Sequence, residues 1–413
     1  MEAFDPFAPE IRANPYPLYR RMRETDPVHW SEEHGAHMLT RYADCSELLR
    51  SPGVSVDARN AELTAERLAQ REDMIERQTA LIGPQAFIMQ AQPMLFSDPP
   101  DHTRLRGLVS KAFTPRRVEE LRPHIESIVD DLIDPLVGRD EIDVIGDVGF
   151  PLPVIVIAQL LGVPLEDREQ LKGWSRDLAR TIDPVITDEV AMRAATSGMQ
   201  FVNYLNGLID ERRQQPRDDL LSALITAEEE GQHLSHPELL VNCILLFIAG
   251  HETTQNLIGN GMLALLRHPD QLARVRDEPA LAKGAVEEML RFDAPVQLTA
   301  RHLLEDRRIG DVNVRKGETV ILLLAAANRD PAQFEDPDRL DITRPDANRH
   351  IAFGSGVHFC LGAPLARVEA QVAIPAMLRR LGPMEPAEPE PPYAENFTLR
   401  GMARLRVAMP PRG

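Results

Sequence analysis

Apolar residues recur along most of the chain at the three- to four-residue spacing of amphipathic helices. Short strand-like stretches occur only near the start, at residues 28–30 and 38–40, and late in the chain, at residues 309–314 and 318–324. No Gly/Ser-rich linker divides the sequence. The pattern therefore predicts a mainly α-helical protein, organised as a single domain over residues 1–413, with few strands.

The longest predicted helix covers residues 237–267. Ser235 and Glu238 form a capping box at its start. Its middle, residues 243–249, is apolar on every side and should be buried, yet the polar residues 250–254 follow directly. Polar groups at the centre of a buried helix cost free energy unless they are used, so this segment is a candidate functional site.

Composition excludes several classes of protein. The chain has 413 residues and a formal net charge of −18, which should repel nucleic acid and anionic membranes. The first 25 residues do not resemble a signal peptide, and the longest apolar run, residues 320–327, is far short of the ~20 residues that span a membrane. We therefore expect a cytoplasmic protein. Its three widely spaced cysteines cannot build a disulfide framework or a zinc ribbon.

One of these cysteines lies in an unusual glycine-rich segment, residues 353–362, with the sequence FGSGVHFCLG. Glycines on both sides of Cys360 permit the backbone to approach a planar group closely. The cysteine also precedes a helix predicted over residues 361–380, whose N-terminal amides and dipole favour a thiolate.

This segment matches the pattern FGxGxHxCxG at every position, and it resembles the haem-binding loop of the cytochrome P-450 family. In that family the cysteine thiolate is the axial ligand of haem iron. The resemblance gives that role to Cys360 and places Phe353 and Gly354 in the haem-binding loop. It implies haem b as the cofactor, and the absence of a CxxCH motif argues against covalent attachment.

The polar segment of the long helix, AGHETT at residues 249–254, resembles the family's oxygen-activation motif. The acid of Glu252 beside the hydroxyl of Thr253 can relay protons, and Ala249 is expected beside the haem. We also expect Gly250 to leave room for oxygen and to loosen the helix into a local bulge. A zinc site is excluded, because HExxH needs a second histidine where Gln255 stands.

Two further sets of residues resemble supporting parts of the family. Glu288 and Arg291 match ExxR on one helix face, and the resemblance adds Arg339, from FxxPxR at residues 334–339, to a buried structural trio. Donors to the haem propionates are expected from one helix face and two later positions, namely His102, Arg106, Arg301 and His358.

The resemblance covers essentially the whole chain and implies the P-450 fold, a large helical domain with a small β-rich corner. It implies a monooxygenase that inserts one oxygen of dioxygen into a C–H bond, by hydroxylation or epoxidation. A peroxide-driven peroxygenase and an oxidative phenol-coupling enzyme of the same fold are the alternatives. The intact Glu252–Thr253 pair argues against the peroxygenase, and a haem sensor that catalyses nothing has no use for that pair.

The substrate itself is not identified by the sequence. A lipophilic molecule is expected, such as a polyketide, terpenoid, steroid or acyl chain. The residues expected to contact it are apolar and mostly aliphatic: Phe87, Ile88, Leu245, Ile248, Val296 and Leu298.

Electrons are expected from a separate ferredoxin or flavodoxin and its reductase. Residues 102–124 contain six Lys and Arg against two Asp and Glu, and residues 344–380 contain five against two. The resemblance places both segments on the cysteine side of the haem. We expect a basic docking patch there that uses cations without assigned partners, namely Arg104, Lys111, Arg116 and Arg367.

Overall fold

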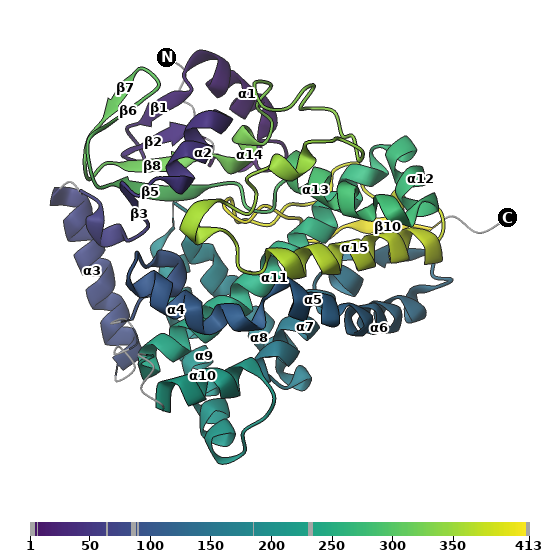
Figure 1. The fold of residues 1–413 in the computed structure, drawn as a ribbon, viewed down its shortest axis with the longest axis horizontal. Helices are drawn as coiled ribbons and strands as arrows, with labels where there is room; N and C mark the ends of the chain where they lie inside the picture. The colour runs from purple at the N-terminus through teal and green to yellow at the C-terminus, as the bar shows by residue number, and fades with distance from the viewer. Residues whose placement is uncertain are drawn as a thin grey trace.

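The computed structural model describes residues 5, 7–62, 65–83, 88, 91–184, 186–229 and 234–409. The molecule is triangular in outline, with helices in its lower and right-hand parts and most strands in the upper left corner (Figure 1). This arrangement confirms the predicted mainly helical fold with a β-rich corner.

The helices are α1 (Tyr16–Thr25), α2 (Tyr42–Arg50), α3 (Ala65–Ile82), α4 (Asp101–Val109), α5 (Pro115–Glu120), α6 (Arg122–Ile133), α7 (Pro151–Leu161), α8 (Arg168–Ala179), α9 (Asp188–Gln214), α10 (Leu220–Glu229), α11 (His236–Leu266), α12 (Pro269–Asp277), α13 (Ala282–Phe292), α14 (Leu324–Ala327) and α15 (Ala363–Arg380). The strands are β1 (Val28–Ser31), β2 (Ala36–Leu39), β3 (Val54–Ser55), β4 (Glu141–Asp143), β5 (Thr299–Leu303), β6 (Arg307–Ile309), β7 (Val312–Val314), β8 (Thr319–Leu322), β9 (Glu385–Pro386) and β10 (Arg406–Ala408).

The corner is a five-stranded sheet in the order β1-β2-β8-β5-β3, in which β2 and β8 run parallel and the other pairs antiparallel. The pattern did not predict β5, because Arg301 and His302 break its apolar alternation. Both side chains are nevertheless buried, since β5 pairs with β8 on one side and, on the other, with β3 from a distant part of the chain. Tertiary pairing therefore creates the strand that carries Arg301.

Helix α11 crosses the molecule and packs against α7, α8 and α15 (Figure 1). Both hydrogen bonds of the capping box at Ser235 and Glu238 are present, as predicted. Its partner α7 belongs to the segment Val144–Leu161, which is long and apolar enough by composition to cross a membrane. In the folded chain 67% of that segment is buried, as is typical of a core helix.

The expectation of a bulge at Gly250 is wrong, because α11 is regular through this residue. A Cβ atom built on Gly250 would lie 2.9 Å from Cγ1 of Ile157 on α7. The glycine therefore allows α7 and α11 to approach closely, and it faces α7 rather than an oxygen site.

Candidate active site

One face of α11 is open at the middle of an otherwise buried helix. Ala249 is exposed, and Leu245 and Thr253, one turn away on either side, are half-buried. Their neighbours Phe247 and Ile248 are buried. The Thr253 hydroxyl donates to the carbonyl oxygen of Ala249 at 2.9 Å. The polar side chain of Thr253 and the small side chain of Ala249 are thus accessible at a position where a core helix would normally be covered.

The cysteine loop is held in shape by its glycines. Gly354 and Gly356 have φ angles of +68° and +70°, which favour glycine. A Cβ on Gly356 would lie 2.5 Å from the carbonyl oxygen of Leu49 on α2, so a larger residue would displace the loop. The backbone N–H of Cys360 donates to the carbonyl of Phe353 at 2.9 Å, which closes the turn.

Burial raises the pKa of the Cys360 thiol. The amides of Gly362 and Ala363 and the guanidinium of Arg106 act in the opposite direction without overcoming burial. The helix N-terminus therefore favours a thiolate, as expected from the sequence, but its effect on the pKa is smaller than that of burial. A coordinating metal ion deprotonates a thiol outright, so iron would supply the missing stabilisation.

Four nitrogen-bearing side chains from α4, β5 and the cysteine loop meet beside this turn. The rings of His102 and His358 lie 4.1 Å apart, and Arg106 donates to the carbonyl of Phe359 at 2.7 Å. Burial, followed by His102 and then Arg301, lowers the pKa of His358 to about 4. The four predicted propionate donors are therefore brought together.

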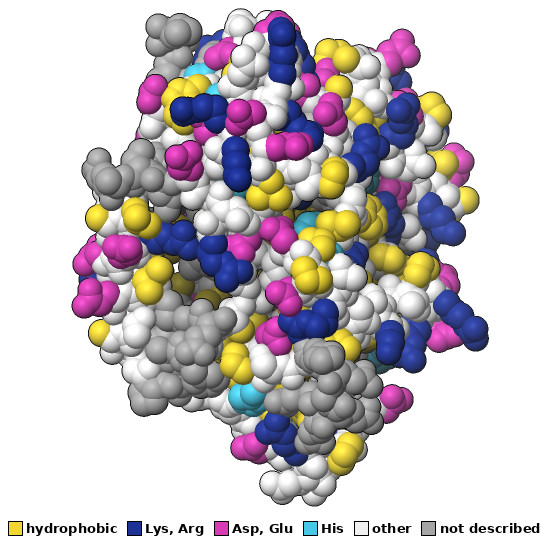
Figure 2. All heavy atoms as spheres, turned by 60° about the vertical axis from the view of Figure 1, so that its left-hand side comes forward, with side chains coloured by type: hydrophobic (Ala, Val, Ile, Leu, Met, Phe, Trp, Pro, Cys, Tyr) yellow, Lys and Arg dark blue, Asp and Glu magenta, His cyan; other side chains and the backbone are white. Residues whose placement is uncertain are grey.

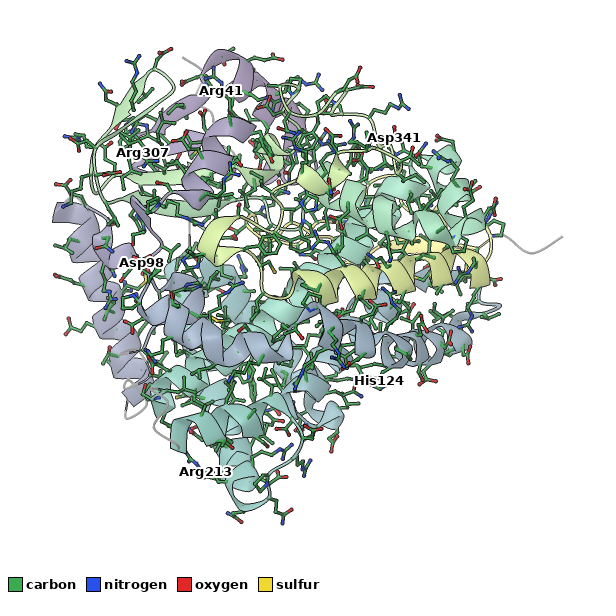
Figure 3. The ribbon with its side chains drawn as sticks, viewed as in Figure 1. Arg41, Asp98, His124, Arg213, Arg307 and Asp341 are labelled. Carbon is green, nitrogen blue, oxygen red and sulfur yellow. The ribbon has the colours of Figure 1, made fainter. Side chains whose placement is uncertain are left out.

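Asp98 is the acid that acts on this cluster, and among the described residues it forms no ion pair with its members. Burial lowers the pKa of Arg301 to about 10, and among the described residues this side chain forms no ion pair. Nδ1 of His102 is buried without a hydrogen-bond partner. Asp98, which lies between the β-rich corner and the helices (Figure 3), already accepts bonds from Ser55 and from the backbone of residue 56. An anionic ligand fits here, and the carboxylates of a haem would satisfy the donors.

Glu288 and Arg291 form the predicted buried pair, with two hydrogen bonds of 2.7 and 2.8 Å and no exposed surface. The third member of the trio is Arg344, whose Nε lies 3.2 Å from both carboxylate oxygens of Glu288. The prediction of Arg339 is wrong, since its side chain is 65% exposed and only its backbone carbonyl takes part.

The reason is the shape of the loop that precedes the cysteine segment. Asp336 has a φ of +42°, and the turn that it forms directs carbonyl groups inward. Those of Glu335 and Asp336 accept from Arg344, and that of Pro337 accepts from Arg291. The amide of Asp341, labelled in Figure 3, donates to Glu288 at 2.9 Å. The trio therefore holds a loop through its backbone.

A second network, which the motifs did not reveal, ties α13 to the cysteine loop and α15. Glu287 accepts from Arg367 at 2.6 and 2.9 Å and lies 3.1 Å from Nε2 of His350. The Arg367 guanidinium lies 4.6 Å from the centre of the Phe353 ring. Burial would raise the pKa of Glu287, but hydrogen bonds from His350 and Arg367 outweigh it and lower this pKa to about 2.

The expected substrate contacts are dispersed in the structure. Ile248 and Val296 share a small apolar cluster with Ala179 and Leu399. Leu298 is buried in the main core, and Ile88 and Leu245 are half-buried against that core. Phe87 lies outside the described residues.

Leu399 was not predicted from the sequence, because it is an apolar residue in an irregular segment with no local motif. A β-bridge to Val296 and backbone bonds from residues 397 and 398 to the Asp183 carboxylate place Leu399 there.

Three of the four cations expected to be unpaired have carboxylate partners. Arg104 pairs with Glu238 and Asp101, Arg116 with Glu120, and Arg367 with Glu287. Figure 2 shows Lys and Arg side chains interspersed with Asp and Glu over the face that it draws. Local ion pairs, which are the alternative to a basic docking patch, therefore occupy three of the four cations.

Comparison with known proteins identifies the family. The family model described as Cytochrome P450 matches residues 40–404. Cytochrome P450 107B1 of Saccharopolyspora erythraea is 44% identical, covering 98% of this chain and 96% of that protein. The vitamin D(3) 25-hydroxylase of Pseudonocardia autotrophica is 42% identical, covering 100% and 98%. A solved structure of P450BioI, in complex with an acyl carrier protein ligated to hexadec-9Z-enoic acid, superposes with a TM-score of 0.86. Its sequence is 40% identical, and the match covers 97% of this chain and 99% of that chain.

The chain therefore belongs to the cytochrome P-450 family and is a haem-thiolate monooxygenase of the bacterial type. Its fold is the P-450 fold. Membership implies a haem with a cysteine ligand, which the donor cluster and the cysteine loop described above can accommodate.

The revised trio gives a first prediction. Arg344→Ala should lower the free energy of unfolding by about 3–5 kcal/mol and reduce haem retention, because it removes a partner from the fully buried Glu288 carboxylate. Arg339→Ala, the matched control on the same loop, should change the free energy of unfolding by no more than about 0.5 kcal/mol. Urea unfolding and haem absorbance measure both effects, and equal losses in the two variants would contradict the assignment.

The second network gives a pH-dependent prediction. The pKa of Glu287 is lower in the folded than in the unfolded chain, so its stabilisation is complete above about pH 5 and is lost as the pH falls toward 2. Glu287→Gln should cost about 3 kcal/mol at neutral pH, and the difference from wild type should shrink at acid pH. Glu120→Gln, which breaks an exposed pair, is the control. A difference between Glu287→Gln and wild type that does not vary with pH would refute the role of Glu287.

Proposed function

We propose that this monooxygenase hydroxylates or epoxidises a lipophilic substrate, with Cys360 as the axial ligand of haem b and residues 1–413 acting as one cytoplasmic domain. The observation that carries the proposal is the cysteine turn beside a buried cationic cluster that forms no ion pair among the described residues. The open face of α11 at Ala249 supports it. When bound, the haem supplies the iron that activates dioxygen.

The chain's own residues hold the cofactor and handle protons. His102, Arg106, Arg301 and His358 would bind the propionates. Phe353 and Gly354 shape the loop, and the Glu288 trio keeps it in place. Thr253 can turn its hydroxyl from the Ala249 carbonyl toward the open face, and the half-buried side chain of Glu252 beside it can take up a proton and pass it on.

The substrate class is supported by the apolar cluster and by the relatives. Ile248, Val296 and Leu399 present aliphatic groups, and Figure 2 shows a hollow in the face that it draws. One relative is named for vitamin D(3) and a solved relative holds a carrier-bound hexadecenoic acid. A steroid, terpenoid, polyketide or acyl chain fits this chemistry. Titration with such compounds should shift the haem absorbance on binding, and a library that leaves the spectrum unchanged would contradict the class.

The intact Glu252–Thr253 pair favours dioxygen over peroxide as the oxidant, and phenol coupling is a second reaction that the same site would support.

A separate ferredoxin or flavodoxin with its reductase would deliver the electrons. The exposed Lys111 and Arg117 on the α4–α5 side form no ion pair among the described residues and would contribute to docking. Reduction by an acidic ferredoxin that does not slow as salt rises would argue against this surface.

Cys360→Ser should abolish the Soret band that is distinctive of the reduced, CO-bound haem-thiolate protein, because a hydroxyl does not provide the thiolate. Cys45→Ser and Cys243→Ser should retain the band, since both cysteines are buried in the core. Absorbance difference spectra measure this, and a normal band in Cys360→Ser would refute the ligand assignment.

Thr253→Ala should keep haem binding and oxygen consumption but divert electrons to hydrogen peroxide. Without the hydroxyl, no side chain at this position passes the proton on. A positioned proton donor commonly accelerates a reaction by about 10²–10⁴-fold. The ratio of product to reductant consumed measures the effect, with Thr226→Ala on α10 as the control hydroxyl deletion. Coupling equal to wild type in Thr253→Ala would exclude the hydroxyl from the relay.

A further inference from the structure

A small apolar cluster borders the open face of α11. Ile248 directly precedes Ala249 in the helix, and it is buried together with Ala179 and Leu399. The cluster thus joins the end of α8, the middle of α11 and a segment near the C-terminus. Half-buried aliphatic side chains pack against these three residues, namely Leu178, Ile182, Ile244 and Val296. Leu399 lies outside the regular helices and strands, so its position depends on individual contacts.

The first of these contacts is a short pairing with the chain that leads into β5. A β-bridge joins Leu399 to Val296, and the amide of Gln297 donates to the carbonyl of Thr398 at 2.9 Å. Two paired segments without further strands are only marginally stable. A second contact is therefore needed to keep Leu399 against Ala179.

The carboxylate of Asp183, in the turn that follows α8, supplies that second contact. It accepts from the amide of Thr398 at 2.7 Å and from the amide of Phe397 at 3.1 and 3.2 Å. The Thr398 hydroxyl also donates to the carbonyl of Ile182 at 3.3 Å. Hydrogen bonds to an ionised acceptor are stronger than those between neutral groups. One side chain therefore fastens the two residues that directly precede Leu399.

The turn that contains Asp183 follows a pair of helices that is cross-linked along its length. Three side-chain hydrogen bonds of 2.7–2.8 Å connect α9 with α8 and the turn before it: Tyr204 to Asp167, Trp174 to Gln200, and Ser197 to Asp177. Asp183 thus ties the position of Leu399 to that of the helix pair. Arg180 and Glu395 link the same two segments, but Glu395 is 67% exposed, and an exposed ion pair contributes little.

We propose that Asp183 is a positioning residue that sets the width of the substrate pocket by holding Leu399 against Ala179 and Ile248. The inference rests on the proposed function, because it places the substrate beside the open face of α11. A fixed aliphatic wall at Leu399 admits slender chains and rejects broad ring systems by steric overlap. When the segment is released, the wall can retreat. Asp183 therefore selects among lipophilic substrates without touching them.

The holding role can be measured without a substrate. In the haem-loaded protein, Asp183→Ala should speed up amide hydrogen exchange at residues 397 and 398 by about tenfold, because both amides lose their acceptor. Glu395→Gln, which breaks the exposed pair with Arg180, is the matched control and should exchange like wild type. Unchanged exchange in Asp183→Ala would overturn the proposal.

Pocket width is measured with two azoles that bind haem iron through a nitrogen: imidazole, which is small, and clotrimazole, which carries three phenyl rings. Asp183→Ala should raise the affinity for clotrimazole relative to imidazole by about tenfold in absorbance titrations. Leu399→Ala, which removes the wall directly, should do the same. The double variant should gain nothing further, because both changes remove the same wall. Additive gains, or an unchanged ratio in Asp183→Ala, would overturn the proposal.

The two single variants separate this inference from the proposed function. An unchanged ratio in Leu399→Ala would exclude the cluster from the pocket and refute the proposed substrate site. A changed ratio in Leu399→Ala with wild-type behaviour in Asp183→Ala would overturn only the role of Asp183. If Asp183→Ala folds poorly, Asp183→Asn, which keeps one acceptor oxygen, should show both effects to a smaller extent. Wild-type exchange and a wild-type ratio in Asp183→Asn would then overturn the proposal.

Discussion

The buried carboxylate of Glu288 is the interaction on which the rest of the site depends. A charge with no exposed surface is costly unless all of its oxygen lone pairs are used. Arg291, Arg344 and the amide of Asp341 use them, and the two arginines in turn bind carbonyl groups of residues 328–339. The charge thus fixes the path of a loop that lacks regular structure. That loop precedes the cysteine segment, so the position of the loop constrains the position of Cys360.

Helix α11 is fixed by a different means. Close packing against α7 at Gly250, and the hydrogen bonds of His251 toward α8, fix the rotation of the helix about its own axis. That rotation leaves Ala249 and Thr253 facing open space. The residues next to the proposed catalytic pair, Glu252 and Thr253, therefore have a packing role, which explains why a buried helix can carry five consecutive polar or small residues.

Charge is distributed unevenly around the cysteine turn. Cationic side chains gather beside the cysteine turn, where burial lowers the pKa values of Arg301 and His358 and the charge of Asp98 offsets only part of this effect. Acidic groups such as Glu287 and Glu288 lie behind the turn, each paired with arginine. The proposed binding of the haem propionates would use the cations beside the turn, whereas the acids behind the turn are already paired.

The sequence by itself determined the features that depend on contiguous residues. These features are local patterns, which can be recognised without knowledge of the fold. They are the capping box, the length of α11, the cysteine loop, the ExxR pair and the Glu252–Thr253 pair. The tertiary structure decided everything that depends on which surfaces meet. It selected Arg344 over Arg339, because only the turn at Asp336 shows which side chain points inward. It formed β5 from a sequence with weak alternation, brought Leu399 beside Val296, and paired Arg104 and Arg367 with acids 134 and 80 residues away. Such contacts join residues far apart in the chain, and no local spacing encodes them.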